Sequence, residues 1–429
     1  MSSIMLTTML VLFALSVPIA VAIGMGSIVG ILSSDGASLL IVGQQMFTSL
    51  DKYPLAAIPF FILAGNLMES GGISARLVEF AKSIVGGVQG GLAATCVLTC
   101  MIFAAVSGSS VATTFAIGAI LIPAMVKHGY PVSFAAALQA TSAELGVIIP
   151  PSIPMILYGI SADVSVAELF IAGVGPGLLI GGVLIVTVLV WARIKGYGKL
   201  DREGRVPLLE STRRAALALL MPVIILGGIY GGVFTPTEAS VVAVFYAVIV
   251  GMLIYREISV ADLVRVLRRS VISSTVILMI IACAGMFSFL ITRANVPAML
   301  GEWLVETLKT PALFLLGVNA ALFVIGMFIE TSASIVVLAP ILTPIAVHFG
   351  IDPVHFGTIM VVNLALGMIT PPFGVNLFAA CMVAKIPLQA IFKHLVPFVA
   401  VVLGCLMIIT YFAPLSLLLR DLVYRSAGG

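Results

Sequence analysis

Ionisable side chains are scarce in this sequence: 9% of its 429 residues are Asp, Glu, Lys or Arg, whereas 61% are hydrophobic. Soluble domains carry about 25% charged residues, so this chain has too little polar surface to be one. A helix needs about 20 apolar residues to cross a bilayer. The sequence has eight runs that are long or nearly free of charge, at 4–32, 92–106, 170–192, 215–233, 238–255, 271–292, 312–329 and 390–413. We therefore predict an all-α polytopic membrane protein.

The low net charge and the small numbers of Cys and His residues exclude several classes of function. The net charge of +3 is too small to indicate a nucleic-acid partner. The five cysteines lie in apolar runs without nearby His or acidic partners, so no disulfide framework or zinc site is expected. With four histidines and no HExxH pattern, nothing indicates an intramembrane hydrolase, and we expect no enzyme activity. No Lys or Arg precedes Lys52, and the first apolar run is too long for a cleavable signal peptide.

Positive charges gather in two places. Seven of them crowd segment 193–214, and four more lie between residues 256 and 269 after two further crossings. The positive-inside rule predicts that both groups are cytoplasmic. We divide the chain into a transmembrane region at 1–50, a first repeat at 51–192, a cytoplasmic basic loop at 193–214, a second half at 215–413 and a C-terminal tail at 414–429.

Two matching helix breaks indicate internal repeats. The segments GVIIPPS (146–152) and GMITPPF (367–373) share a glycine and a double proline at a spacing of 221 residues. Glycine and proline fix backbone geometry, so such matches mean more than apolar ones. Upstream of each break, small hydroxyl residues begin a stretch that ends at a proline. We predict two inverted structural repeats, with re-entrant hairpins near 107–125 and 328–347 and broken helices near 132–160 and 353–384.

A break in a helix inside a membrane leaves backbone carbonyl oxygens without their helical hydrogen-bond partners. Pro151 and Pro372 cannot donate a hydrogen bond, so the carbonyls of Val147 and Met368 lose their helical partners. Free carbonyl oxygens at mid-membrane are suitable ligands for a small cation such as Na⁺. The alternatives are a proline kink that serves only packing and, for the hydroxyl-rich stretches, Ser/Thr contacts between helices.

Three segments carry a resemblance to a known family. The segments SGSSVATTFAIGAILIPAMVKHGY (107–130), GVIIPPSIPMILYG (146–159) and GMITPPFGVNLF (367–378) resemble the large membrane subunit of tripartite ATP-independent periplasmic (TRAP) transporters. The resemblance spans roughly residues 50 to 413. It implies an elevator-type secondary transporter of the bacterial inner membrane, in which a scaffold holds a moving transport domain built from two hairpins and two broken helices.

The resemblance also implies ligands and partners. Na⁺ is the expected coupling ion, with no other cofactor, and organic acids such as C4-dicarboxylates or sialic acids are the expected substrates. A small four-helix membrane subunit and a soluble periplasmic substrate-binding protein are the expected partners. The first Na⁺ is expected at Ser107, Ser109, Gly146, Ile149 and Pro151. The second is expected at Glu330, Gly367, Thr370 and Pro372.

Substrate contacts are expected from residues beside the breaks and from charges in apolar surroundings, which cost several kcal/mol unless they serve a function. These candidates are Ser109, Ser110, Ser152, Arg293, Glu330 and Asn376. Arg293 follows a charge-free run and offers a fork for a carboxylate, although it equally fits an arginine that reaches the membrane interface. Glu330, where the family usually has Asp, offers a carboxylate for Na⁺ or for Arg293. Glu144 matches no family motif.

Two other functions remain open from the sequence. An ion channel uses broken helices as a filter but needs no alternating access. A stand-alone Na⁺-coupled carboxylate transporter of the wider ion-transporter group has the same fold and ion sites without a binding protein. Neighbouring genes for a small four-helix protein and a secreted binding protein distinguish this second alternative from the tripartite system.

Overall fold

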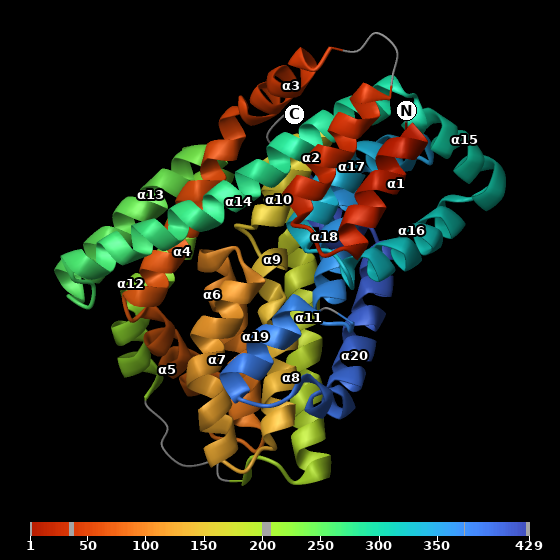
Figure 1. Cartoon of the computed structure of the whole chain (residues 1–429). Coiled ribbons are helices and arrows are strands. Elements are labelled where there is room, and N and C mark those ends of the chain that lie inside the picture. Colours follow the sequence, from red (N-terminus) through yellow and green to blue (C-terminus); the bar gives the residue numbers. More distant parts are fainter. Residues whose placement is uncertain (1, 34–37, 200–206, 373, 426–429) are drawn as a thin grey trace.

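The computed structural model describes residues 2–33, 38–199, 207–372 and 374–425 (Figure 1), and within these ranges all regular secondary structure is helical. The helices up to the basic loop are α1 (Ser2–Ala14), α2 (Ile19–Leu32), α3 (Leu40–Leu50), α4 (Ala57–Ser70), α5 (Ile73–Val85), α6 (Gly91–Ser107), α7 (Ser110–Lys127), α8 (Val132–Ala143), α9 (Leu145–Ile148), α10 (Ile153–Ala162) and α11 (Val166–Lys195). Those that follow it are α12 (Leu208–Tyr230), α13 (Pro236–Val248), α14 (Val260–Arg293), α15 (Val296–Leu308), α16 (Pro311–Gly326), α17 (Thr331–His348), α18 (Pro353–Met368), α19 (Val375–Ala384), α20 (Phe392–Tyr411) and α21 (Pro414–Arg420). Short 3₁₀ or π turns lie at Tyr53–Ala56, Ile249–Ile254, Leu388–Ala390 and Asp421–Arg425.

Several of the apolar helices are each long enough to cross a membrane. Among the described residues, seven helices qualify by length and composition, and ten spans result if each of three bent helix pairs counts as one. The prediction of an all-α polytopic membrane protein is confirmed. The predicted basic loop comprises the end of α11, residues 200–206, which lie outside the described residues, and the start of α12.

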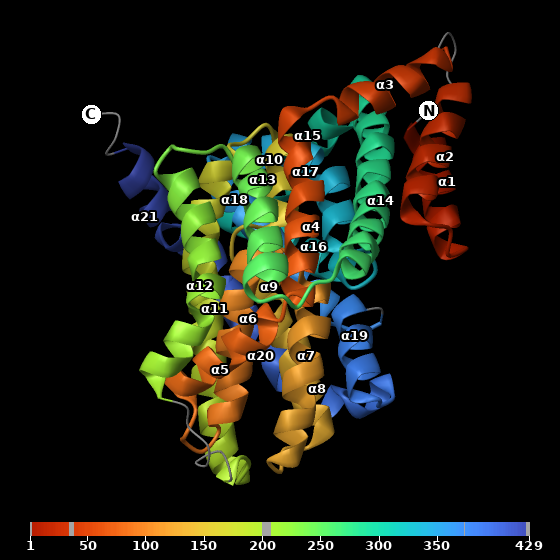
Figure 2. The same ribbon diagram turned by 90° about the vertical axis from the view of Figure 1, so that its left-hand side faces the viewer.

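Two helical hairpins enter the molecule from opposite ends. Figure 2 shows α6 and α7 below the short helix α9, and α16 and α17 above it. The ranges expected for the hairpins cover the tip and second arm of each one, and the first arms are α6 and α16. Among the described residues, each half therefore contains a helical hairpin followed by an interrupted helix. Their relation as inverted repeats stays a prediction.

Each interrupted helix reaches across to the other half of the chain. The chain passes from α8 through α9 into α10, which packs against α17 of the second hairpin. In the second half α18 leads into α19, which packs against α7 and α8 of the first hairpin and helix. The two halves are thus interlocked at the centre of the molecule, where both breaks lie.

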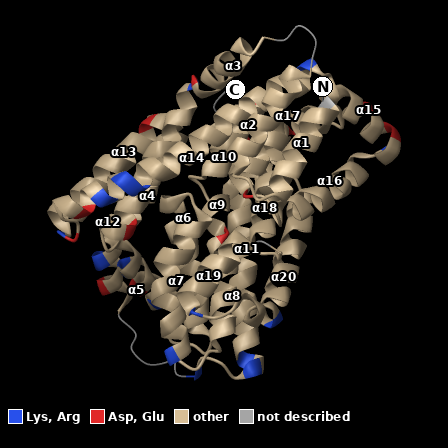
Figure 3. Cartoon of the chain, viewed as in Figure 1, with Lys and Arg blue, Asp and Glu red and all other residues tan. Residues whose placement is uncertain are grey.

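One group of basic side chains lies at one end of the molecule. Figure 3 shows Lys and Arg at the lower ends of the helices around α7, α8 and α20. Helices α7 and α11 end there with Lys127 and with Arg193 and Lys195. The positive-inside rule favours the cytoplasm for this end, and the helix α21 lies toward the opposite end in Figure 2.

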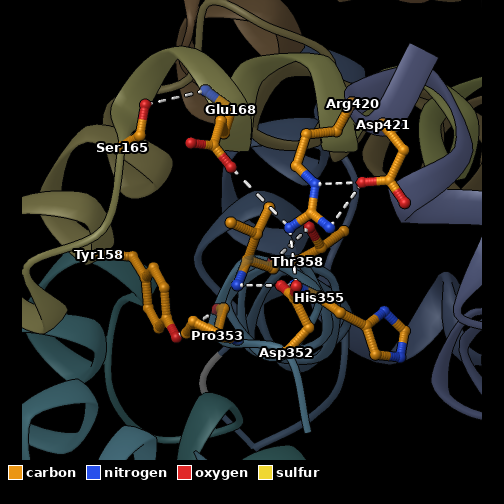
Figure 4. A network of polar contacts seen from close by, with 10 residues as sticks. Tyr158, Ser165, Glu168, Asp352, Pro353, His355, Thr358, Arg420 and Asp421 are labelled. Carbon is orange, nitrogen blue, oxygen red and sulfur yellow. Dashed lines mark hydrogen bonds and ion pairs between the residues drawn. The ribbon is translucent and has the colours of Figure 1, made fainter. Parts of the chain in front are cut away.

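An ion network holds α21 against the rest of the chain (Figure 4). The Arg420 side chain is only 8% exposed, and its Nη1 lies 2.7 Å from Asp352 Oδ2 and 3.8 Å from Glu168 Oε2. Its Nε and Nη2 donate to Asp421 Oδ1 at 2.9 and 2.7 Å. Asp352 also caps α18, and although partial burial opposes ionisation, the bonds from Arg420 and the helix N–H groups lower its pKa. The predicted C-terminal tail therefore begins with an anchored helix.

We expect Arg420→Gln to lower the free energy of unfolding by about 2 kcal/mol. Removing one partner of a buried ion pair costs about 3–5 kcal/mol, and the partly exposed carboxylates here reduce that figure. Thermal unfolding of the purified protein in detergent measures it. Arg265→Gln is the matched control, because the Arg265 side chain is 79% exposed and pairs with the nearby Asp262, so its loss costs less than about 1 kcal/mol. Equal midpoint temperatures of unfolding for the two variants would contradict a stabilising role for the network.

Candidate ion and substrate site

The tip of the first hairpin lies directly against the first helix break. Gly108 links α6 to α7 with a left-handed φ of 60°, and Ser109 caps α7 by accepting the Ala112 N–H at 3.4 Å. A Cβ atom placed on Gly108 would lie 2.9 Å from the Pro151 carbonyl oxygen. One placed on Gly146 would lie 2.8 Å from the Ser109 carbonyl oxygen. Glycine is required at both positions because backbone meets backbone there.

Hydroxyl and carbonyl oxygens cluster at this contact. Ser107 Oγ and Thr113 Oγ1 are 3.0 Å apart, and the Thr113 hydroxyl donates to the Ser109 carbonyl at 2.8 Å. The structure thus brings Ser107, Ser109, Gly146 and Pro151 together, and Ile149 continues the same break in an extended conformation. Thr113 joins them through its place one turn into α7, and the sequence offered only the general hydroxyl content of this stretch as a signal.

The carbonyl freed by Pro151 has a partner within the break. Val147 O accepts a hydrogen bond from the Ser152 hydroxyl at 2.5 Å, and Ser152 Oγ also accepts the Met155 N–H at 3.3 Å as the cap of α10. Ser152 is fully buried. The Ser152 hydroxyl therefore satisfies a backbone carbonyl at the helix break, and the buried side chain does not face a substrate cavity.

The second break meets the second hairpin through two glycines. A Cβ atom on Gly367 of α18 would lie 2.4–2.8 Å from the backbone of Gly326, the last residue of α16. At the start of α17, the Thr331 hydroxyl lies 2.9 Å from the sulfur of Met368. The hairpin tip and the end of α18 are consequently in direct contact, as at the first break.

Thr370 lies in this second break beside Gly367. Its N–H donates to the Gly367 carbonyl and its hydroxyl to the Leu366 carbonyl, both at 2.9 Å. The Pro371–Pro372 peptide bond is cis, and so is Pro150–Pro151 at the first break. Residue 373 lies outside the described residues.

Glu330 caps the second arm of the hairpin. Its carboxylate accepts the backbone N–H groups of Ser332 at 2.8 Å and Ala333 at 3.2 Å, and the Ser332 hydroxyl at 2.9 Å. Arg293 is not its partner. Arg293 ends α14 with an exposed side chain, and its neighbour Thr292 lines a cavity with Pro344 and His348 near the far end of α17. Glu330 and Pro344 are separated by about 20 Å of helix.

Glu144 and Asn376 connect the two broken helices. The Asn376 side-chain N–H donates to Glu144 Oε1, and both residues are buried. Glu144 lies between α8 and α9, whereas Asn376 is in the first turn of α19. Among the described residues, Glu144 Oε2 and Asn376 Oδ1 have no hydrogen-bond partner. Asn376 was expected near substrate; the structure gives it a partner in Glu144, and sequence reasoning missed the pair.

This geometry can be compared with known proteins. Residues 6–415 match the family model of the tripartite ATP-independent periplasmic transporter, DctM component. The chain belongs to the DctM family. The C4-dicarboxylate TRAP transporter large permease DctM of Pseudomonas aeruginosa is 43% identical over 400 residues, which cover 93% of this chain and 94% of that protein. The sialic acid TRAP transporter large permease SiaM of Vibrio cholerae is 34% identical, with 91% of each chain covered.

A solved structure shares the fold of this DctM-family chain. The YdaH transporter of Alcanivorax borkumensis superposes with a TM-score of 0.64 over 91% of this chain and 88% of its own, at 16% sequence identity. Such a low identity shows the fold alone. Membership of the DctM family confirms the resemblance to TRAP large membrane subunits and identifies a transporter permease rather than an enzyme. The family implies a small membrane subunit and a periplasmic binding protein as partners.

Proposed function

We propose that this protein takes up an organic acid across the bacterial inner membrane by Na⁺-coupled secondary transport. The observation that carries the proposal is that each helix break contacts the tip of a helical hairpin, once at Gly108 and Pro151 and once at Gly326 and Gly367. Interrupted helices in corresponding positions of two halves are the usual location of substrate and coupling ions in secondary transporters.

The oxygen atoms at the two breaks fit Na⁺ as the coupled cargo. The Ser109 carbonyl and the hydroxyls of Ser107 and Thr113 meet at the first break, and the Thr370 hydroxyl lies at the second. These are neutral, hard oxygen ligands, which suit a cation that must bind and leave again. We include Gly146, Ile149 and Pro151 in the first site, and Glu330, Gly367 and Pro372 in the second.

Two sodium ions supply enough free energy for accumulation. Each charge gains about 2.3 kcal/mol from a potential of 100 mV, and a tenfold gradient adds about 1.4 kcal/mol. Two ions therefore provide about 7 kcal/mol, which is more than a thousandfold accumulation of a neutral solute. A dianion carries charge against the potential and requires at least three ions for net inward positive charge.

The relatives indicate the class of substrate. The names of the two permeases above refer to C4-dicarboxylates and to sialic acid, and the more similar of the two is the C4-dicarboxylate permease. We propose an organic acid of these classes, delivered by a periplasmic binding protein to this chain and a small four-helix subunit. Transport proceeds as an elevator, with both hairpins and both broken helices moving against a scaffold.

Uptake into proteoliposomes tests this function. Vesicles containing the chain and its small subunit are offered labelled succinate or N-acetylneuraminate, with and without an inward Na⁺ gradient and with and without the binding protein. We expect uptake that needs both. Uptake with Na⁺ alone favours a stand-alone carrier, and uptake indifferent to Na⁺ contradicts the ion sites.

We expect Thr370→Ala to raise the Na⁺ concentration for half-maximal uptake about fivefold, because one hydroxyl ligand contributes about 1 kcal/mol. The Na⁺ dependence of uptake at saturating substrate measures the change. Thr187→Ala is the matched control, since the Thr187 hydroxyl bonds the Val183 carbonyl at 2.7 Å in the same i−4 pattern but within α11. A similar Na⁺ dependence in both variants would remove Thr370 from the second site.

A further inference from the structure

A small cavity opens beside the tip of the first hairpin. Its volume is about 220 Å³, and its walls come from α4, the hairpin tip, the start of α10 and α14. The polar side chains that line it are those of Asn66, Ser107, Ser109, Arg269 and Ser273. Because a water molecule occupies about 30 Å³ of liquid, the cavity has the volume of about seven waters. That is room for an acid of four carbons.

One face of α14 supplies a wall of this cavity. Arg269, Ser273 and Ile277 line it at intervals of four residues, which places them on the same side of the helix. The Asn66 amide donates to the Ser270 hydroxyl at 2.8 Å in a buried contact and fixes α14 against α4 at this level. The guanidinium of Arg269 is therefore carried on a positioned helix beside the hairpin serines.

Arg269 is only lightly engaged within the chain. Its Nη1 lies 3.5 Å from Glu69 Oε2, at the long limit of a hydrogen bond, and its side chain is 55% exposed. A guanidinium carries five N–H donors in a planar fork that matches a carboxylate in bidentate fashion. Both the donors and the access that a second carboxylate needs are thus present.

We propose that Arg269 binds a carboxylate of the transported acid in this cavity and that Glu69 competes for the same guanidinium. The proposal rests on the function proposed above and identifies the residue that binds the carboxylate of the substrate. It assigns to Arg269 the role that the sequence suggested for Arg293, whose position near the far end of α17 keeps it away from both hairpin tips. The cavity has the volume for a small dicarboxylate, and its one cationic side chain matches one of the two carboxylates.

Equilibrium binding of labelled succinate tests the assignment. The purified complex of the chain and its small subunit is titrated at saturating Na⁺, and thermal unfolding without succinate reports folding. We expect Arg269→Gln to weaken binding at least tenfold and Arg269→Lys, which keeps the charge but loses the fork, to fall between it and wild type. Arg268→Gln, the exposed neighbour on the same helix, should stay within twofold of wild type. Glu69→Gln should tighten binding several-fold, because it removes the competitor.

Each outcome decides between the two proposals. Wild-type binding of succinate with an unchanged affinity in Arg269→Gln would overturn the assignment and leave the transport function intact. Weaker binding in Glu69→Gln would show that the ion pair is structural and would also overturn it. If Arg269→Gln does not fold, the Lys and Glu69 variants carry the test. Absence of wild-type binding to succinate and to N-acetylneuraminate would refute the proposed function, and the assignment with it.

Discussion

Gly367→Ala is expected to abolish uptake and to lower the free energy of unfolding by about 3 kcal/mol. The added Cβ would lie 2.4 Å from the Gly326 carbonyl carbon and 2.5 Å from its Cα. Backbone atoms cannot rotate away as a flexible side chain does, so α16 and α18 must separate at the hairpin tip. Overpacking of this kind costs about 1–3 kcal/mol and sometimes more. Uptake into proteoliposomes and thermal unfolding measure the two effects.

Gly404→Ala in α20 is the control for this substitution. It makes the same chemical change in an apolar helix, but nothing lies within 4 Å of the added atom. Alanine favours a helix over glycine by up to about 1 kcal/mol, so Gly404→Ala should be neutral or slightly stabilising and should transport normally. Normal uptake by Gly367→Ala would show that the close contact of the two helices is dispensable for transport.

Asn376→Ala and Glu144→Ala should each reduce uptake more than tenfold and cost about 2 kcal/mol of stability. Without Asn376, neither oxygen of the buried Glu144 carboxyl group retains a described partner. An unsatisfied buried polar group costs about 1–3 kcal/mol. Loss of the bond also removes a polar contact between α19 and the end of α8, although their packing remains. Thermal unfolding and uptake of the two variants check this result.

A double-mutant cycle isolates the pair. If the two side chains act through each other, the double variant Glu144→Ala/Asn376→Ala should lose less stability than the sum of the single losses. Glu144→Gln keeps the shape and an acceptor oxygen and should retain most of the stability. Strict additivity of the single effects would show that the two residues contribute independently.

Local backbone chemistry made much of this architecture predictable. A scarcity of charge identified the membrane class, and the double prolines at 150–151 and 371–372 located both breaks because proline acts on its own helix. The tip of the first hairpin followed from the small residues 107–110 next to an apolar run. These signals depend on a few neighbouring residues, so they can be recognised in the sequence before the three-dimensional structure is known.

Contacts between residues that are far apart in the sequence could not be predicted from such local patterns. Glu144 and Asn376 are 232 residues apart, and Arg269 and Glu69 are 200 apart. Arg293 and Arg269 both adjoin a charge-free run, and only the path of α14 distinguishes the one near a hairpin tip from the one at a helix end. Ser152 was equally ambiguous, because a hydroxyl beside a break can serve a substrate or its own backbone. Its bond to Val147 decides for the backbone.

The interlocking of the two halves has a consequence for biosynthesis. The pocket for Glu144 is completed by α19, and the ribosome must add 232 more residues after Glu144 before Asn376 exists. At about 5–20 residues per second, this takes about 10 to 50 s. During that interval the first hairpin and its broken helix are already made but have no α19 to pack against. Insertion machinery must therefore shelter an incomplete first half until the second half arrives from the ribosome.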